Sequence, residues 1–209
     1  AADIAFGSGY SVAGMALGAE SSHTCSISGS GLVKCFGQAS ESPFPTTATS
    51  FAGLLGHCWN RTSAAASALD CSVSGLASGG RFAQAYGNSA ELAALPSVDL
   101  GAGFGAAQIA AGGSHTCVRS TAGAVKCWGK NDLGQLGNGG SAPAGQTSAS
   151  MGAGLSTAIA SGVTDLAVGL SHACAVVNGT ELRCWGDGGM SGLGTADAVR
   201  TPVSAYDGR

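Results

Sequence analysis

Short stretches in which small or apolar residues alternate with polar ones recur along the chain, and glycines separate them. In the segment 117–128, CVRS and AVKCW both alternate, and Gly123 lies between them. Alternation with a period of two on both sides of a glycine turn predicts a β-hairpin. Similar turns surround Gly29 in the first part of the chain and Gly179 in the last part. We therefore expect short antiparallel strands.

The predicted hairpins belong to a sequence repeat. Segments that begin at Ser22, Ser114 and Ser171 read SHTCSISGSGLVKCFG, SHTCVRSTAGAVKCWG and SHACAVVNGTELRCWG. In each segment nine residues separate the two cysteines, and an aromatic residue and a glycine follow the second cysteine. Three copies with identical internal spacing indicate one structural unit that is used several times.

A fourth, degenerate copy is expected between the first two. FAGLLGHC at 51–58 resembles the start of a repeat, and GRFAQAYGNSAEL at 80–92 resembles the Cys-Trp-Gly segment. An insertion that carries Cys71 separates these halves. The chain is therefore predicted to be one repeat domain, 1–209. Its approximate repeats are 1–48, 49–103, 104–160 and 161–209.

The two cysteines of each hairpin are expected to lie opposite each other. Opposed positions on antiparallel strands bring Cβ atoms to within about 5 Å, close to the separation in a disulfide. The predicted pairs are Cys25 with Cys35, Cys117 with Cys127, Cys174 with Cys184 and, by elimination, Cys58 with Cys71. A two-residue turn at Asn178-Gly179 would set Cys174 opposite Arg183, so the third hairpin requires a longer or bulged turn.

The repeat resembles the regulator of chromosome condensation repeat, whose blades form a β-propeller. The matching stretches are GGSHTC at 112–117, VKCWG at 125–129 and NDLGQLG at 131–137. The copy at 169–194 departs from the pattern, because Gly188 stands where the asparagine is expected. The resemblance implies a repeat core formed by His115, Trp128, Gly129, Gly134, Gln135, Gly137, His172, Trp185, Gly186 and Gly194.

An all-β fold is expected, in which about four propeller-like blades form an open arc or a partial propeller. Composition agrees, because 36 glycines and only 10% charged residues argue against a helical bundle. Well-known propellers of the family have seven blades, so three arrangements stay open. The chain is part of a larger polypeptide, or it forms an open arc whose end strands are covered by a protein partner or by a second copy, or it closes as a small four-bladed ring.

Charge and composition argue against two kinds of partner, nucleic acids and the membrane interior. A net charge of −3 provides no basic stripe for phosphates, so no nucleic-acid binding is expected. The segment 133–164 is uncharged, but glycine, serine, alanine and threonine fill it, and no membrane span is predicted.

Eight cysteines in local pairs predict an oxidising compartment: secreted, cell-surface, periplasmic or organelle-lumenal. Asn60 and Asn178 lie in acceptor patterns for an N-linked glycan and are candidate modification sites. Asn178 is expected at an accessible hairpin tip.

Metal binding is the competing interpretation of the His-x-Cys motif. A histidine and two cysteines would offer zinc three ligands per repeat. The C-x-x-C knuckle is absent, which favours disulfides. Asp187, Asn131 and Asp132 lie in glycine-rich loops, where we expect turn capping rather than calcium binding.

The leading hypothesis for function is a non-enzymatic scaffold that makes protein contacts through loops and exposed blade edges, within a larger assembly. No cofactor and no catalytic residue are predicted, because no catalytic motif converges and the four histidines belong to the repeats. The alternative is a secreted binding or inhibitory module that grips a soluble protein with one propeller face. An enzyme is the less favoured hypothesis.

Overall fold

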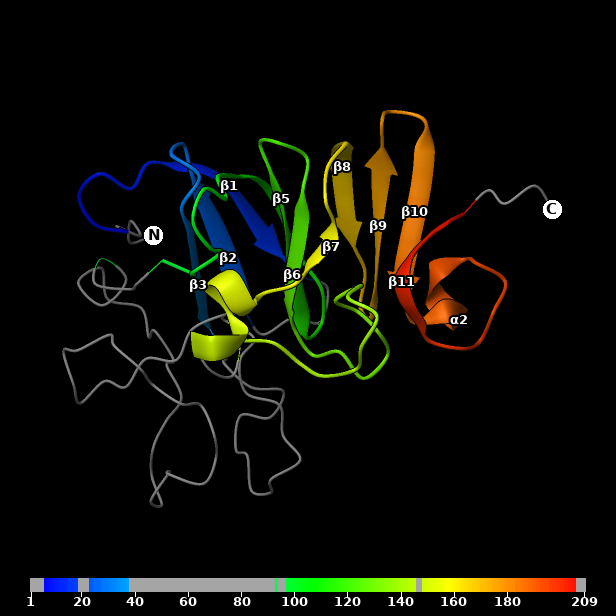
Figure 1. Cartoon of the computed structure of the whole chain (residues 1–209). Helices are drawn as coiled ribbons and strands as arrows, with labels where there is room; N and C mark the ends of the chain where they lie inside the picture. The colour runs from blue at the N-terminus through cyan, green and yellow to red at the C-terminus, as the bar shows by residue number, and fades with distance from the viewer. Residues whose placement is uncertain (1–5, 19–22, 38–92, 94–96, 146–147, 206–209) are drawn as a thin grey trace, which may run out of the picture.

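A computed structural model describes residues 6–18, 23–37, 93, 97–145 and 148–205. The expected second repeat falls largely outside these residues, and so do Asn60 and the expected pair of Cys58 with Cys71. The described chain is all-β, with three antiparallel sheets side by side (Figure 1).

Each sheet is a meander whose strands follow the chain order, as in a propeller blade. The first blade contains β1 (Val12–Leu17), β2 (His23–Ser28) and β3 (Val33–Gly37). The middle blade contains β4 (Ala106–Ala111), β5 (His115–Ser120), β6 (Val125–Gly129) and β7 (Thr157–Ile159). The last blade contains β8 (Val163–Val168), β9 (His172–Val177), β10 (Glu181–Gly186) and β11 (Val199–Ser204).

Helical turns occur only between and after the strands of the described chain. Two 3-10 turns, η2 (Ser148–Ser150) and η3 (Gly152–Gly154), precede β7, and the short helix α2 (Gly188–Ser191) follows β10. None of the helices in the described ranges is long and apolar enough to cross a membrane.

A disulfide joins the two hairpin strands of each described blade. The bonds link Cys25 with Cys35, Cys117 with Cys127, and Cys174 with Cys184. In all three blades the two cysteines are direct partners across the hairpin, and their Cα atoms are 4.1 Å apart. The nine-residue spacing therefore predicted these three pairs correctly.

The third hairpin has the longer turn that the pairing of Cys174 with Cys184 requires. Asn178 and Gly179 have φ of 53° and 72°, as in the tight turn that Asn-Gly favours. Val177 nevertheless pairs with Glu181 rather than with Thr180. The extra residue is accommodated after the turn and restores the opposition of the cysteines.

The first and middle blades are direct neighbours in space, although residues 38–105 separate β3 from β4 in the sequence. The Ala106 N–H donates to the Gly31 carbonyl across the junction, at 3.2 Å. The Val98 N–H donates to the Val33 carbonyl at 2.7 Å, on the outer edge of the first blade. Ile159 pairs with the equivalent residue of β6 in the middle blade. Val98 thus occupies the position of a fourth strand.

Candidate functional site

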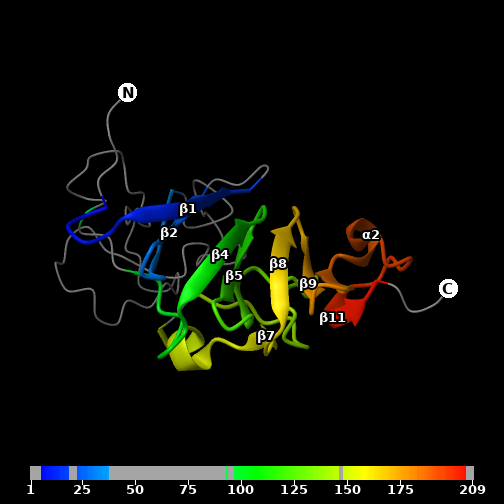
Figure 2. The ribbon, with the colours of Figure 1, turned by 90° about the horizontal axis from the view of Figure 1, so that it is seen from above.

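The first strand of each blade has the same register against the hairpin that follows it. Seen from above, β1, β4 and β8 follow one another along the array (Figure 2). In each blade, one alanine of this first strand pairs with the first hairpin cysteine: Ala16, Ala110 or Ala167. This shared register lets the residues of the three blades be compared position by position.

Three positions of each first strand lie on the side that faces the preceding blade. They are Val12, Met15 and Leu17 in the first blade, Ala106, Ile109 and Ala111 in the middle blade, and Val163, Leu166 and Val168 in the last blade. The direction follows from the register, because Ala111 pairs with Thr116. The Thr116 side chain contacts the first blade through His23.

Burial at these positions depends on whether a blade precedes them. Ile109 is 8% exposed and Leu166 is 4% exposed, whereas the equivalent Met15 is 61% exposed. Its neighbours Val12 and Leu17 are 50% and 66% exposed. The inner part of the first blade therefore presents an apolar row to solvent. We call Val12, Met15, Leu17 and Thr24 the start face.

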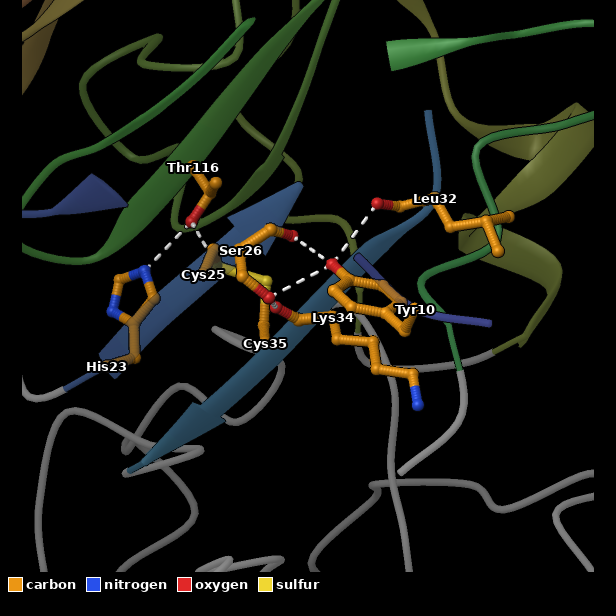
Figure 3. The surroundings of a disulfide bond; sticks show 8 residues. All are labelled: Tyr10, His23, Cys25, Ser26, Leu32, Lys34, Cys35 and Thr116. Carbon is orange, nitrogen blue, oxygen red and sulfur yellow. Dashed lines mark hydrogen bonds between the residues drawn. A yellow bond between two sulfur atoms is a disulfide. The ribbon is translucent and has the colours of Figure 1, made fainter. Parts of the chain in front are cut away.

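A side-chain hydrogen bond connects the first and middle blades. The His23 Nε2 and the Thr116 hydroxyl are 2.8 Å apart, beside the disulfide of the first blade (Figure 3). Both residues are buried. Burial lowers the pKa of His23 to about 4, so the imidazole is neutral in this junction.

The next junction lacks this bond. Ala173 occupies the position of Thr116, as its pairing partners show. His115 is buried, and neither ring nitrogen has a hydrogen-bond partner. Burial lowers the pKa of His115 to about 3, and the neighbouring imidazoles of His23 and His172 add to this shift. The backbone of His172 raises the same pKa and offsets part of the shift.

Both histidines make stability depend on pH. Their pKa values are lowered in the folded protein to about 4 for His23 and about 3 for His115, so the unfolded chain binds protons that the folded chain does not. Stability is full above about pH 6.5 and is lost as the pH falls. Between about pH 7.5 and 5, where carboxylates stay ionised, we expect a loss on the order of 3 kcal/mol.

Urea unfolding at several pH values measures this loss. The His115→Gln variant removes one of the two titrating groups, so its free energy of unfolding should fall by about half as much over the same range. An unchanged pH slope in that variant would contradict the assignment.

Restoring the missing bond should stabilise the protein. Ala173→Thr places a hydroxyl where Thr116 has one, and we expect a gain of about 0.5–1.5 kcal/mol over Ala173→Val, which has the same shape without the hydroxyl. The comparison cancels the crowding that both variants introduce at a fully buried position. Equal unfolding midpoints in urea for the two variants would rule out the bond.

The loop that follows Trp128-Gly129 in the middle blade packs against the last blade. Trp185 is fully buried, and its indole N–H donates to the Gln135 carbonyl at 2.9 Å. Gly137 has φ of 66°, and a Cβ there would lie 2.9 Å from the Trp185 ring. Asn131 orders the loop, since its amide donates to the carbonyls of Gly140 and Ala142 and its Oδ1 accepts from the Leu136 N–H.

The remaining residues of the predicted repeat core also lie at blade ends and in loops. Gly129 and Gly186 end β6 and β10 and pair with His115 and His172. Gly134 has φ of 81° within the loop, and Gly194 lies beyond α2. Trp128 is fully buried. Asp187 caps α2 by accepting from the Gly189 N–H.

A further repeated element lies outside the His-x-Cys segments from which the sequence repeat was defined. FGSGY at 6–10 and LGAGF at 100–104 precede β1 and β4 by the same distance. In each case a lysine from the hairpin, Lys34 or Lys126, lies over the final aromatic ring and donates to the carbonyl of the first residue. Figure 3 shows the first of these rings, Tyr10, whose hydroxyl donates to the Ser26 carbonyl.

The structure bears on the competing zinc interpretation and on the position of one candidate glycan acceptor. All described cysteines of the three hairpins form disulfides and have no thiolate to offer zinc. Asn178 is exposed at its hairpin tip, the location expected for a glycan acceptor.

The sequence and the fold of these blades are similar to those of known proteins. The family model "Regulator of chromosome condensation (RCC1) repeat" matches residues 106–135. Among solved structures, the chain is similar to human WBSCR16, with a TM-score of 0.57 and 16% identity over 94% of this chain and 40% of that one. It is also similar to Prp20p from Saccharomyces cerevisiae, with a TM-score of 0.51 and 15% identity over 98% of this chain and 52% of that one.

The chain therefore spans about half the length, or less, of these structures. No curated protein matches it by sequence. The repeat match and the three disulfide-linked meanders support one conclusion. Residues 106–135 carry the regulator of chromosome condensation (RCC1) repeat, and the described sheets resemble blades of the β-propellers in these structures.

Proposed function

We propose that the protein is a non-enzymatic scaffold that makes protein contacts through the open faces and loops of its blades. The start face is the observation that carries this proposal. Met15 is 61% exposed at a position where Ile109 and Leu166 are buried against a neighbouring blade. Contiguous apolar residues that a fold buries elsewhere and leaves open at one place are typical of interaction surfaces.

Use of the repeated polar residues within the fold supports a non-enzymatic role. His23 bonds to Thr116, Asn131 holds a loop, and Lys34 and Lys126 donate to backbone carbonyls. The histidine and the lysine recur between blades and Asn131 does not, but all of them are engaged in contacts of the fold, which gives them no separate chemical task. A structure of yeast RCC1 (Prp20), similar to this chain at a TM-score of 0.50, 14% identity and 51% of its own length, contains bound Kap60, and we extend protein binding to this chain by proposal.

An oxidising compartment is part of the proposal. Three disulfides in successive blades support a secreted, cell-surface or organelle-lumenal location, because such bonds persist where thiols are not kept reduced. Titration of the denatured, unreduced native protein tests this: almost no free thiol is expected, and eight reactive thiols would contradict it.

Size measurement on native material tests the scaffold itself. We expect the protein, extracted gently without reductant, to elute in an assembly and to cross-link through the start face. Met15→Glu should release it from the assembly, because the variant places a charge on the apolar row. A free monomer in native material without cross-linked neighbours would reject the scaffold function.

A further inference from the structure

The last blade has a partly exposed face of its own, beside α2 and at the opposite end of the array from the start face (Figure 1). It is defined by His172, Cys174, Val176 and Leu182, and all four are half-buried. The equivalent residues of the first blade are covered by the middle blade: His23 is 2% exposed, Cys25 and Val33 are 0% exposed, and Ile27 is 5% exposed. We call the four residues of the last blade the end face.

The start face and the end face have the chemistry of the two sides of one junction. Between the first and middle blades, Ile27 and Val33 lie on one side, and Ile109 and Thr116 lie on the other. The end face keeps apolar residues and a histidine at the first set of positions, and the start face keeps apolar residues and a threonine at the second set. None of the eight residues carries a fixed charge.

We propose that the start face of one copy of this chain docks the end face of a second copy, in the same geometry as the junctions within the chain. This inference rests on the proposed scaffold function and names its partner. Thr24 would then be the partner of His172, as Thr116 is the partner of His23.

Backbone groups extend the same match. The Ala106 and Val163 N–H groups donate to the hairpin carbonyls of Gly31 and Gly123 in the preceding blade, at 3.2 Å and 3.0 Å. Val12 holds this position in β1. A docked blade would therefore present its hairpin tip, around 178–180, to the Val12 N–H.

The shared register supports a second copy as the occupant. A second copy brings side chains to the start face at the same positions that the junctions within this chain already pack together. A contact between unlike faces is heterologous, so a pair of copies that makes it twice leaves neither its start faces nor its end faces open.

Sedimentation of the purified, oxidised full chain tests the proposal with two complementary variants. Met15→Glu blocks the start face, and Val176→Glu blocks the end face. We expect the wild type to sediment at twice its 20.0 kDa mass. Each variant alone should be monomeric at about 0.1 mM, where a thousandfold loss of a micromolar affinity leaves little dimer.

Mixing the two variants gives the decisive result. An equimolar mixture should form a dimer, because one intact start face meets one intact end face. Ala13→Glu is the matched control, since it places the same charge on β1 at a position whose equivalents, Ala107 and Thr164, stay exposed in covered blades. Ala13→Glu should stay dimeric, and Thr24→Val should weaken the dimer about 3- to 10-fold.

Several outcomes would overturn the proposal. They are a monomeric wild type at about 0.1 mM, a mixture that stays monomeric, and a Met15→Glu or Val176→Glu variant that stays dimeric alone, which points to a contact between like faces. Leu182→Glu replaces Val176→Glu if that variant does not fold.

Failure here is separable from failure of the scaffold function. A wild type that is monomeric alone but joins other proteins in native material rejects the second copy and leaves the scaffold intact. A native protein whose additional blades cover Met15 rejects the second copy in the same way. A dimeric purified chain that is free of any assembly in native material rejects the scaffold alone.

Discussion

Replacing Trp185 by alanine is expected to lower the free energy of unfolding by about 3–5 kcal/mol. The side chain is 0% exposed and fills the space between the last blade and the loop that follows the middle blade. Its removal leaves a cavity and an unpaired carbonyl at Gln135. Urea unfolding of the oxidised protein, followed by far-UV circular dichroism, measures the loss.

Two further variants separate packing from hydrogen bonding. Trp185→Phe keeps most of the apolar volume and loses the N–H donor, so a smaller loss of about 1–3 kcal/mol is expected. Met190→Ala shortens a side chain that is 51% exposed and should change stability by no more than about 0.5 kcal/mol. If Trp185→Ala unfolds at the wild-type urea concentration, the indole is not part of the junction.

Local patterns carried enough information to predict the hairpins and their disulfides. A spacing of nine residues with glycine at the turn brings two cysteines together within a single hairpin, independent of any distant contact. Pairing across a hairpin depends only on the residues between its strands. The sequence alone therefore showed that Cys174 can face Cys184 only if the turn at Asn178-Gly179 is longer or bulged. Nearest-neighbour geometry is therefore readable from the sequence.

Contacts between blades were not readable in the same way. The difference between Thr116 and Ala173 is visible in SHTC and SHAC, but its effect on His115 depends on which blade each residue faces. Val98 reaches the edge strand of the first blade from beyond 38–97, and no local rule fixes that separation. The repeated FGSGY and LGAGF segments were an available signal that lay outside the aligned motif.

Removing the disulfide of the middle blade should lower the free energy of unfolding by about 3 kcal/mol. Cys117 and Cys127 are ten residues apart, and both are buried. Closing a loop of this length restricts the unfolded chain, and the entropy released by opening it accounts for a loss of about this size. Replacing both cysteines by alanine avoids a reactive thiol. Guanidinium unfolding compared with the wild type measures the loss.

Replacing Cys174 and Cys184 by alanine provides the matched comparison, because the last blade has the same loop length but Cys174 is less buried than Cys117. An entropic origin predicts similar losses at both sites, whereas a packing origin predicts a larger loss in the middle blade. Because the bonds lie in different blades, the two losses should add in the quadruple variant to within about 0.5 kcal/mol. Losses near zero at both sites would mean that blade packing alone holds the hairpins, and the disulfides would then have no stabilising role in this propeller.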